Sequence, residues 1–140
     1  MKEIAKDYYE YWFDKGKGFL LGANDFLQRN QNSIAAFLLH QATESFYSSI
    51  LLVFSNYKPK LHDIEELGGR AANYNSELWE VFPQANEEQK ECFELLKKAY
   101  VDARYDKNYR ISKEQLLYLI ERVEKLKNIM ERICLERINQ

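Results

Sequence analysis

The chain of 140 residues has the length of one globular domain, and its 46% hydrophobic and 14% aromatic residues are enough to build one core. Only 5 Gly and 2 Pro are present, which excludes fibrous and disordered classes of protein. The 20 basic and 22 acidic residues nearly cancel, so no strong overall field attracts nucleic acid or anionic lipid, and any anion site must be local. We expect a single domain over residues 1–140.

The sequence carries no signal for a membrane or for export. No apolar run is long enough to cross a bilayer, and the first stretch, MKEIAKDYYEYW, lacks the apolar segment of a secretory signal. We therefore expect a cytoplasmic protein without membrane contact. Cys92 and Cys134 fall in helical patterns, and neither they nor His62 and Asp63 match a zinc arrangement. The expectation is reduced, packed thiols, no metal and no other cofactor.

The first segment, which ends near Arg29, predicts a helix, because apolar residues recur there at spacings of three and four. The expected buried face consists of Tyr9, Trp12, Gly16, Phe19, Ala23 and Phe26. Gly16 and Ala23 are small enough to let another helix approach closely. Tyr8, Tyr11 and Phe13 lie beyond that face and predict a surface for self-association.

A second and very apolar helix is expected over residues 34–54, with Asn32 or Ser33 as its N-terminal cap. Pro59 then predicts a loop, since proline lacks a backbone donor and keeps the preceding residue out of the helical region. A short third helix should start near Asp63 and end near Tyr74. One further turn is expected before Pro83.

Two helices are expected in the last third of the chain. Asn86 and Gln89 resemble a capping box and open a helix over residues 87–105. Ser112 and Gln115 form a second such box ahead of the final helix. Its buried residues should be Leu116, Leu119, Val123, Leu126, Met130 and Ile133.

These elements predict an all-α protein. Strand signals are missing, and short loops between long helices favour antiparallel neighbours. The expected architecture is an up-and-down antiparallel bundle of four long helices with a short inserted helix.

His40, Glu44 and Tyr47 stand at i, i+4 and i+7 of the second helix, so they share one face although their surroundings are apolar. A buried imidazole and a buried carboxylate are costly unless they are hydrogen-bonded. Two interpretations remain open at this point. The three residues form a structural network, or they line a functional cleft.

The segment from Lys97 to Lys113 is locally basic, and Tyr100, Tyr105 and Tyr109 are interleaved with its cations. Tyrosine rings offer surfaces on which bases stack, and the cations can hold phosphates. The alternative is a solvated helix end, whose basic residues complement the helix dipole. Motifs of the usual nucleotide-binding folds, of zinc proteases and of α/β-hydrolases do not occur in the chain.

Three stretches of the chain read AAFLLHQATESFY, YKPKLHDIEEL and LLKKAYVDARYDKNYRISKEQL. Together they resemble the HEPN domain (higher eukaryotes and prokaryotes nucleotide-binding). The resemblance extends from about Ala35 to about Leu126, and the stretches follow the family's order. It implies a helical bundle that pairs as a homodimer and binds nucleotide or RNA. It also implies a minimal nucleotidyltransferase as partner, either fused or separately encoded.

Many HEPN proteins are metal-independent ribonucleases that use an arginine followed, after four to six residues, by a histidine. Arg104 matches that arginine, but Tyr109 stands where the histidine would be. A tyrosine with a pKa near 10 is a poor general base at neutral pH, whereas a histidine near 6.5 is well suited. The resemblance therefore leaves catalysis open and favours an anion site of Arg104, Tyr105 and Tyr109.

The second stretch of matching residues widens this candidate site. His40, Gln41, Glu44 and Tyr47 match the family's HQAxExxY pattern, and His62 matches its loop histidine. The leading hypothesis is an accessory module that binds nucleotide or RNA and serves a nucleotidyltransferase in a toxin–antitoxin or defence setting. One alternative is an endoribonuclease in which His40 or His62 replaces the missing histidine. The other is a non-catalytic dimeric adaptor.

Overall fold

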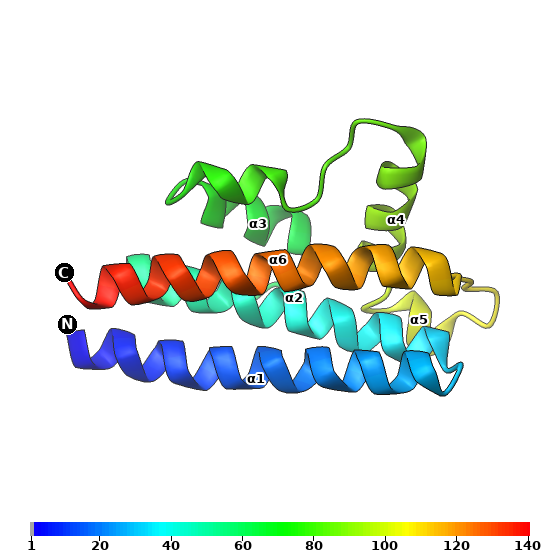
Figure 1. Ribbon diagram of the computed structural model, residues 1–140, viewed down its shortest axis with the longest axis horizontal. Coiled ribbons are helices and arrows are strands. Elements are labelled where there is room, and N and C mark those ends of the chain that lie inside the picture. The colour runs from blue at the N-terminus through cyan, green and yellow to red at the C-terminus, as the bar shows by residue number, and fades with distance from the viewer. Residues whose placement is uncertain (1) are drawn as a thin grey trace.

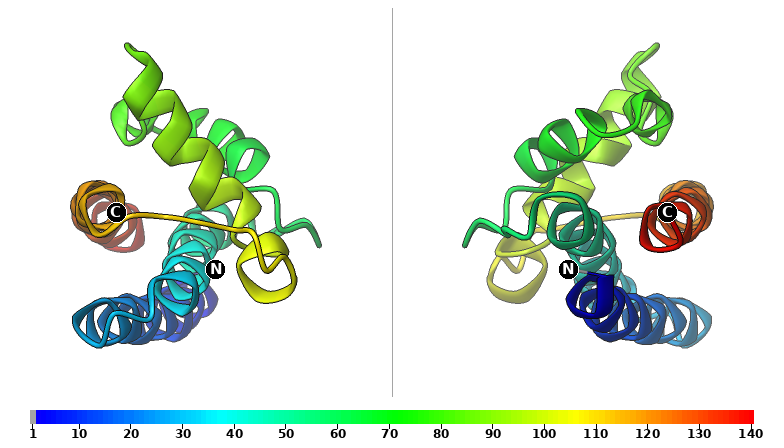
Figure 2. Two further views of the ribbon diagram at one scale, coloured as in Figure 1. Left: turned by 90° about the vertical axis from the view of Figure 1, so that its right-hand side faces the viewer. Right: turned by 90° about the vertical axis from the view of Figure 1, so that its left-hand side faces the viewer.

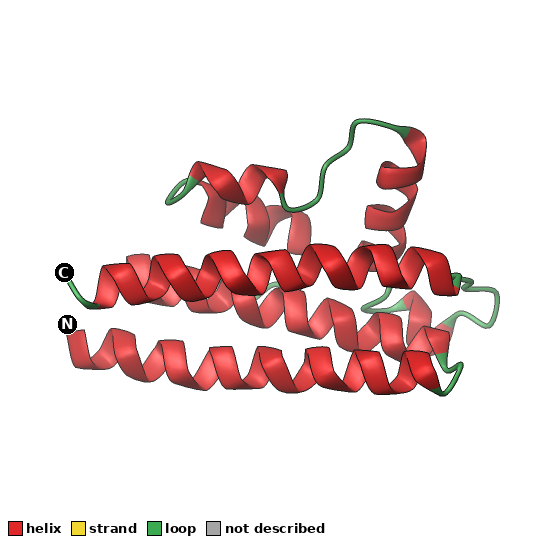
Figure 3. Cartoon of the chain, viewed as in Figure 1, coloured by secondary structure: helices red, strands yellow, loops and turns green. Residues whose placement is uncertain are grey.

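The computed structural model describes residues 2–140, and in that range the chain contains helices and loops but no strand (Figure 3). Three long helices lie side by side: α1 (Lys2–Gln28), α2 (Asn32–Ser55) and α6 (Lys113–Ile138) (Figure 1). α1 is antiparallel to both others, while α2 and α6 run in the same direction. The predicted all-α bundle is confirmed.

The segment between α2 and α6 carries the chain back along the bundle. It consists of α3 (Ile64–Ala72), the 3-10 helix η1 (Ser76–Glu80), α4 (Glu87–Lys98) and the four-residue α5 (Asp102–Tyr105). α4 crosses the long helices steeply instead of running alongside them (Figure 1). The helix expected over residues 87–105 is thus divided in two. At the break the amide of Ala99 already bonds to the carbonyl of Leu96, 3.1 Å away, in a tighter turn.

Side-chain caps fix the starts of three of the α-helices. Asp63 caps α3, Asn86 accepts the amide of Gln89 at 2.9 Å, and Ser112 and Gln115 form the expected capping box of α6. The predicted cap of α2 by Asn32 or Ser33 is wrong. The amide group of Asn32 instead donates to the carbonyl of Ile111 at 3.0 Å, which ties the start of α2 to the start of α6.

The core forms around α2, which packs against α1, α3 and α6. All six residues predicted to be buried on the final helix are buried. The buried face of α1 differs from the expected one and consists of Tyr9, Phe13, Gly16, Leu20, Ala23 and Leu27. Phe13 therefore belongs to the core, so its expected place on a self-association surface is wrong. Tyr11 stays 58% exposed.

Among residues 2–140, none of the helices combines the length and the hydropathy that a membrane span requires. The two ends of the described chain lie at the same end of the bundle (Figure 1).

Candidate functional site

α2 places two ionisable side chains inside the bundle. The exposed fraction is 0% for His40 and 7% for Glu44, which lies one helical turn further along. A carboxylate in such a position needs a partner. The structure supplies one from a segment that is distant in sequence, the loop between α2 and α3.

That partner is His62, whose Nδ1 contacts Oε1 of Glu44. The loop runs back over α2 on the side away from α6, and α5 lies on the same side (Figure 2). The side chain of His62 is 52% exposed, so the pair joins a buried carboxylate to an accessible imidazole. A carboxylate on one ring nitrogen orients the imidazole and leaves its other nitrogen free for a ligand.

Tyr100, just beyond the end of α4, joins the two histidines. Its ring stacks on that of His62, with centroids 4.1 Å apart and an interplanar angle of 15°. The ring of His40 lies on the inner side of the group, 5.4 Å from the same centroid. The sequence offered Tyr100 as one of three rings on which bases could stack, but the anion site favoured by the resemblance did not include it.

Arg104 is held against the same tyrosine. Its Nε donates to the carbonyl of Tyr100 at 2.8 Å, and its guanidinium carbon lies 4.8 Å from the ring centroid of that residue. The rings of Phe37 and Tyr105 approach the guanidinium to 4.7 and 4.9 Å. Cation–π contacts with three rings fix a side chain that is otherwise very flexible. We call Phe37, His40, Glu44, His62, Tyr100 and Arg104 the Tyr100 cluster.

His40 contributes an uncharged imidazole to this cluster. Burial lowers its pKa from 6.5 to about 4, and the hydrogen bond with Gln41 opposes that shift only in part. Its Nδ1 lies 3.4 Å from Oε1 of Gln41. Within the described chain no partner is found for its Nε2. At neutral pH the ring of His40 is therefore uncharged, and it has no contact with solvent.

The structure does not bring Tyr47 and Tyr109 into the cluster. The hydroxyl of Tyr47 packs against α3, where a Cβ added to Gly68 would lie 3.0 Å from it. The hydroxyl of Tyr109 donates to the carbonyl of Leu95 at 2.7 Å and so ties the loop before α6 to α4. Burial raises the pKa of both phenols. Tyr105, by contrast, touches Arg104 and is 74% exposed.

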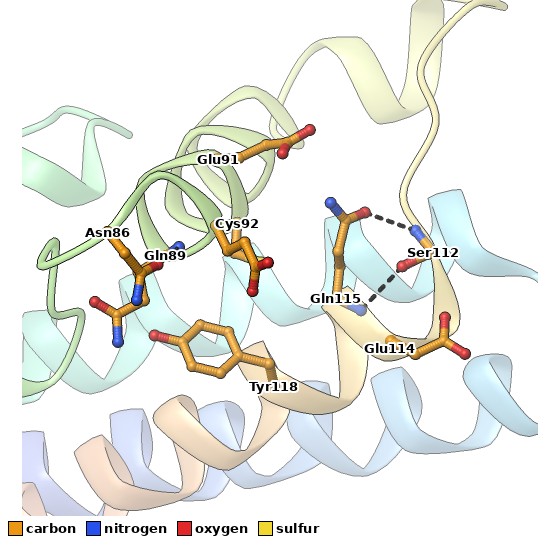
Figure 4. A pocket seen from close by; sticks show the side chains of 9 residues that line it. Asn86, Gln89, Glu91, Cys92, Ser112, Glu114, Gln115 and Tyr118 are labelled. Atoms are coloured by element: carbon orange, nitrogen blue, oxygen red, sulfur yellow. Dashed lines mark hydrogen bonds between the residues drawn. The ribbon is translucent and has the colours of Figure 1, made fainter.

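A separate cavity of about 490 Å³ opens between the starts of α4 and α6 (Figure 4). None of the predicted site residues lines it. Its lining consists of Asn86, Glu88, Gln89, Glu91, Cys92, Ser112, Glu114, Gln115 and Tyr118. Three carboxylates without a basic lining residue make this cavity unfavourable for a phosphate.

The described part of the chain, residues 2–140, contains no group of three or more His, Cys, Asp or Glu side chains arranged to hold a metal ion. Cys92 and Cys134 are both buried and free. Burial raises the pKa of each thiol, to about 12 for Cys134. Neither cysteine has the lowered pKa of a reactive thiol.

Comparison with known proteins adds one match. The family model described as the HEPN domain matches residues 9–133, which include α2, the loop that carries His62, and Arg104. No curated protein matches the chain.

Proposed function

The chain belongs to the HEPN domain family, and we propose that it binds nucleotide or RNA phosphates at the Tyr100 cluster, as the accessory of a nucleotidyltransferase in a toxin–antitoxin or defence setting. Arg104 carries the proposal. Its guanidinium is fixed by the carbonyl of Tyr100 and by three rings, that of Tyr100 among them. None of the hydrogen bonds found within residues 2–140 uses its two terminal nitrogens. These nitrogens form the planar fork that binds phosphate in two places at once.

The neighbouring residues have complementary roles in this proposal. Tyr105 offers an exposed ring on which a base can stack, and His62 offers its second ring nitrogen as a hydrogen-bonding group. His40, Gln41 and Glu44 hold these groups in place from α2. Tyr47 and Tyr109 act from further away, by fixing α3 and α4 against the rest of the fold. The transferase partner and a homodimeric state are part of the proposal, and the family resemblance supports them.

The test is Arg104→Ala, measured by fluorescence anisotropy with a labelled adenine nucleotide and a labelled short RNA. A charge-assisted hydrogen bond to phosphate contributes about 1.5–3 kcal/mol, so the affinity should fall roughly tenfold or more. Arg104→Lys should restore only part of it, because an ammonium keeps the charge and loses the fork.

Arg137→Ala is the matched control, since Arg137 is also exposed and also lies over a ring, that of Phe54, at 5.5 Å. It should leave both affinities unchanged. If Arg104→Ala binds like the wild type and keeps its circular dichroism spectrum, the binding proposal is wrong and the adaptor hypothesis becomes the better one.

The pair of His62 and Glu44 favours a second candidate, a metal-independent endoribonuclease. An accessible imidazole oriented by a carboxylate is the usual arrangement of a general base. His62 would take the proton of an RNA 2′-hydroxyl, whose oxygen attacks the adjacent phosphorus while the 5′-oxygen leaves with a proton from water. His40 is unsuited to this role, because it is fully buried and its pKa is about 4.

Cleavage of a labelled RNA in the presence of a chelator tests this candidate. The wild type should cleave, and His62→Ala should lose at least about a hundredfold in rate, the lower end of what general base catalysis contributes. If the wild type bound RNA without cleaving it, the endoribonuclease would be excluded and the accessory role would remain.

A further inference from the structure

Trp12 on α1 is approached by two lysines from different elements. Nζ of Lys15 lies 5.1 Å from the centroid of the indole, and Nζ of Lys58, from the loop after α2, lies 5.3 Å from it. Lys15 also donates to the hydroxyl of Tyr11 at 3.3 Å. Two ammonium groups and two aromatic side chains are thus gathered at one place on the surface.

Lys15 and Lys58 differ from two other lysines of α1, which pair with carboxylates. Lys6 pairs with Glu10, and Lys17 pairs with Asp14. Across residues 2–140 no carboxylate forms an ion pair with Lys15 or Lys58. Their positive charge is therefore available to an anion from outside, and Tyr11, which is 58% exposed, lies next to Lys15.

The loop between α2 and α3 connects this surface with the Tyr100 cluster. Lys58 precedes His62 by four residues on the same loop, so their Cα atoms are at most ~14 Å apart. His62 stacks on Tyr100, and Arg104 contacts the same ring. The loop and α5 lie on one side of α2 (Figure 2). In this row of cations and rings, Lys58 contacts Trp12 of α1, and His62 on the same loop stacks on Tyr100, which precedes α5.

We propose that this row binds single-stranded nucleic acid over several nucleotides, with Trp12, Lys15 and Lys58 holding nucleotides that follow the one at Arg104. The proposal rests on the proposed function, because Arg104 anchors the first phosphate. Alternating cations and aromatic rings suit a single strand, whose bases are free to stack on protein and whose phosphates follow at regular intervals. A mononucleotide fills only the end at Arg104.

The experiment compares adenosine monophosphate with hexanucleotides of RNA and of DNA, all labelled. The wild type should bind the hexanucleotides more tightly than the mononucleotide. Lys15→Ala and Lys58→Ala should each weaken hexanucleotide binding about fivefold or more and leave the mononucleotide unaffected. Each should also reduce the salt dependence of hexanucleotide binding by about 0.7 in the log–log slope. Lys125→Ala, an exposed lysine of α6, is the matched control and should change nothing.

Trp12 provides a direct signal for the same binding event. The chain has 2 Trp, so Trp79→Phe leaves Trp12 as the only indole. The substitution suits the fold, because Trp79 on η1 is 64% exposed. Its fluorescence should be quenched by the hexanucleotides and not by the mononucleotide. Equal binding of RNA and DNA and tighter binding of RNA both support the proposal, and the comparison shows whether 2′-hydroxyl contacts contribute.

Two results distinguish the proposal from its premise. If the two lysine variants behave like Lys125→Ala while Arg104→Ala weakens every ligand, the extended row is wrong and the proposed function stands. If Arg104→Ala changes no affinity, the proposed function fails and the extended row fails with it.

Discussion

His40 is a titratable group that the fold keeps uncharged, and this makes stability depend on pH. Its pKa is about 4 in the folded chain and about 6.5 when unfolded. Between these values only the unfolded chain binds the proton, so stability is complete above pH 6.5 and declines as the pH falls toward 4. The expected loss is on the order of 3 kcal/mol, measured by urea denaturation between pH 4 and 8.

His40→Gln separates this contribution from that of the carboxylates, which titrate in both proteins. The variant should be less stable at pH 7, and its free energy of unfolding should vary less between pH 6.5 and 4. Equal pH dependence in the two proteins would show that the imidazole of His40 becomes protonated without unfolding.

Tyr109 gives a second prediction for a single side chain. Its hydroxyl donates to the carbonyl of Leu95, and its exposed fraction is 7%. Tyr109→Phe should lower the free energy of unfolding by about 1 kcal/mol, the net value of one hydrogen bond. Nucleotide affinity should stay the same, since the phenol has a structural partner. A fall in affinity as large as that of Arg104→Ala would place Tyr109 in the binding site itself.

Part of the candidate site could be predicted from the sequence. Helical spacing is enough to place His40 and Glu44 on one face, because the period of an α-helix is fixed. The pairing of Glu44 with His62 could not be foreseen, since it depends on the path of the loop. The contacts of Phe37 and Tyr100 with Arg104 were missed for a similar reason. Their contacts with Arg104 require the break after α4, and periodicity does not encode it.

The contact between α1 and α2 yields a prediction at neighbouring glycines of one helix. A Cβ added to Gly16 would lie 2.4 Å from the ring of Phe46, which is fully buried, whereas nothing lies within 4 Å of one added to Gly18. Gly16→Ala should therefore destabilise the fold by about 1–3 kcal/mol through overpacking. Gly18→Ala should stabilise it by roughly 0.5–1 kcal/mol, because alanine loses less backbone entropy in a helix.

Thermal denaturation of the two variants gives the comparison, with Gly18→Ala as the control for helix propensity. If both substitutions raised the melting temperature, the ring of Phe46 would have room to move, and α1 and α2 would be less closely packed than the structure has them.

The helices themselves show where sequence patterns are ambiguous. α1 carries adjacent apolar pairs at 12–13, 19–20 and 26–27. Together with Gly16 and Ala23, the first members of these pairs recur at spacings of three and four, and so do the second members. The pattern therefore allows two alternative buried faces of α1, shifted by one residue along the chain. The sequence favoured Trp12, while packing against α2 buries Phe13. Tertiary contacts decide between faces that local periodicity leaves equivalent.

The arrangement of the whole bundle also depends on more than the number of helices. Short loops predicted antiparallel neighbours, and this is correct for α1 and α2. α6 runs parallel to α2, because α3 to α5 return the chain to the far end of the bundle (Figure 1). That return brings the loop with His62 and the segment with Arg104 to the same side of α2. The candidate site is therefore a product of the inserted segment.

The whole molecule is expected to self-associate. The family resemblance implies a homodimer, and large aliphatic side chains are exposed at Leu21 (66%), Ile34 (43%) and Leu117 (47%). They belong to the end of α1 and to the starts of α2 and α6, which lie at one end of the bundle (Figure 1). Burying these side chains against a second copy removes apolar surface from water, which favours the dimer. We predict a dimer in sedimentation experiments at micromolar concentration.

Leu21→Glu should shift this equilibrium toward the monomer, because a carboxylate without a partner is costly to bury in an interface.

Tyr11→Glu tests whether the surface around Trp12 takes part in pairing. Tyr11 is also exposed on α1 but lies beside Trp12 and Lys15, so its substitution should weaken hexanucleotide binding and leave the dimer intact. If Tyr11→Glu dissociated the dimer instead, pairing would cover Trp12, and oligonucleotide and second copy would compete for one surface. A strictly monomeric wild type would mean that one chain supplies the whole site.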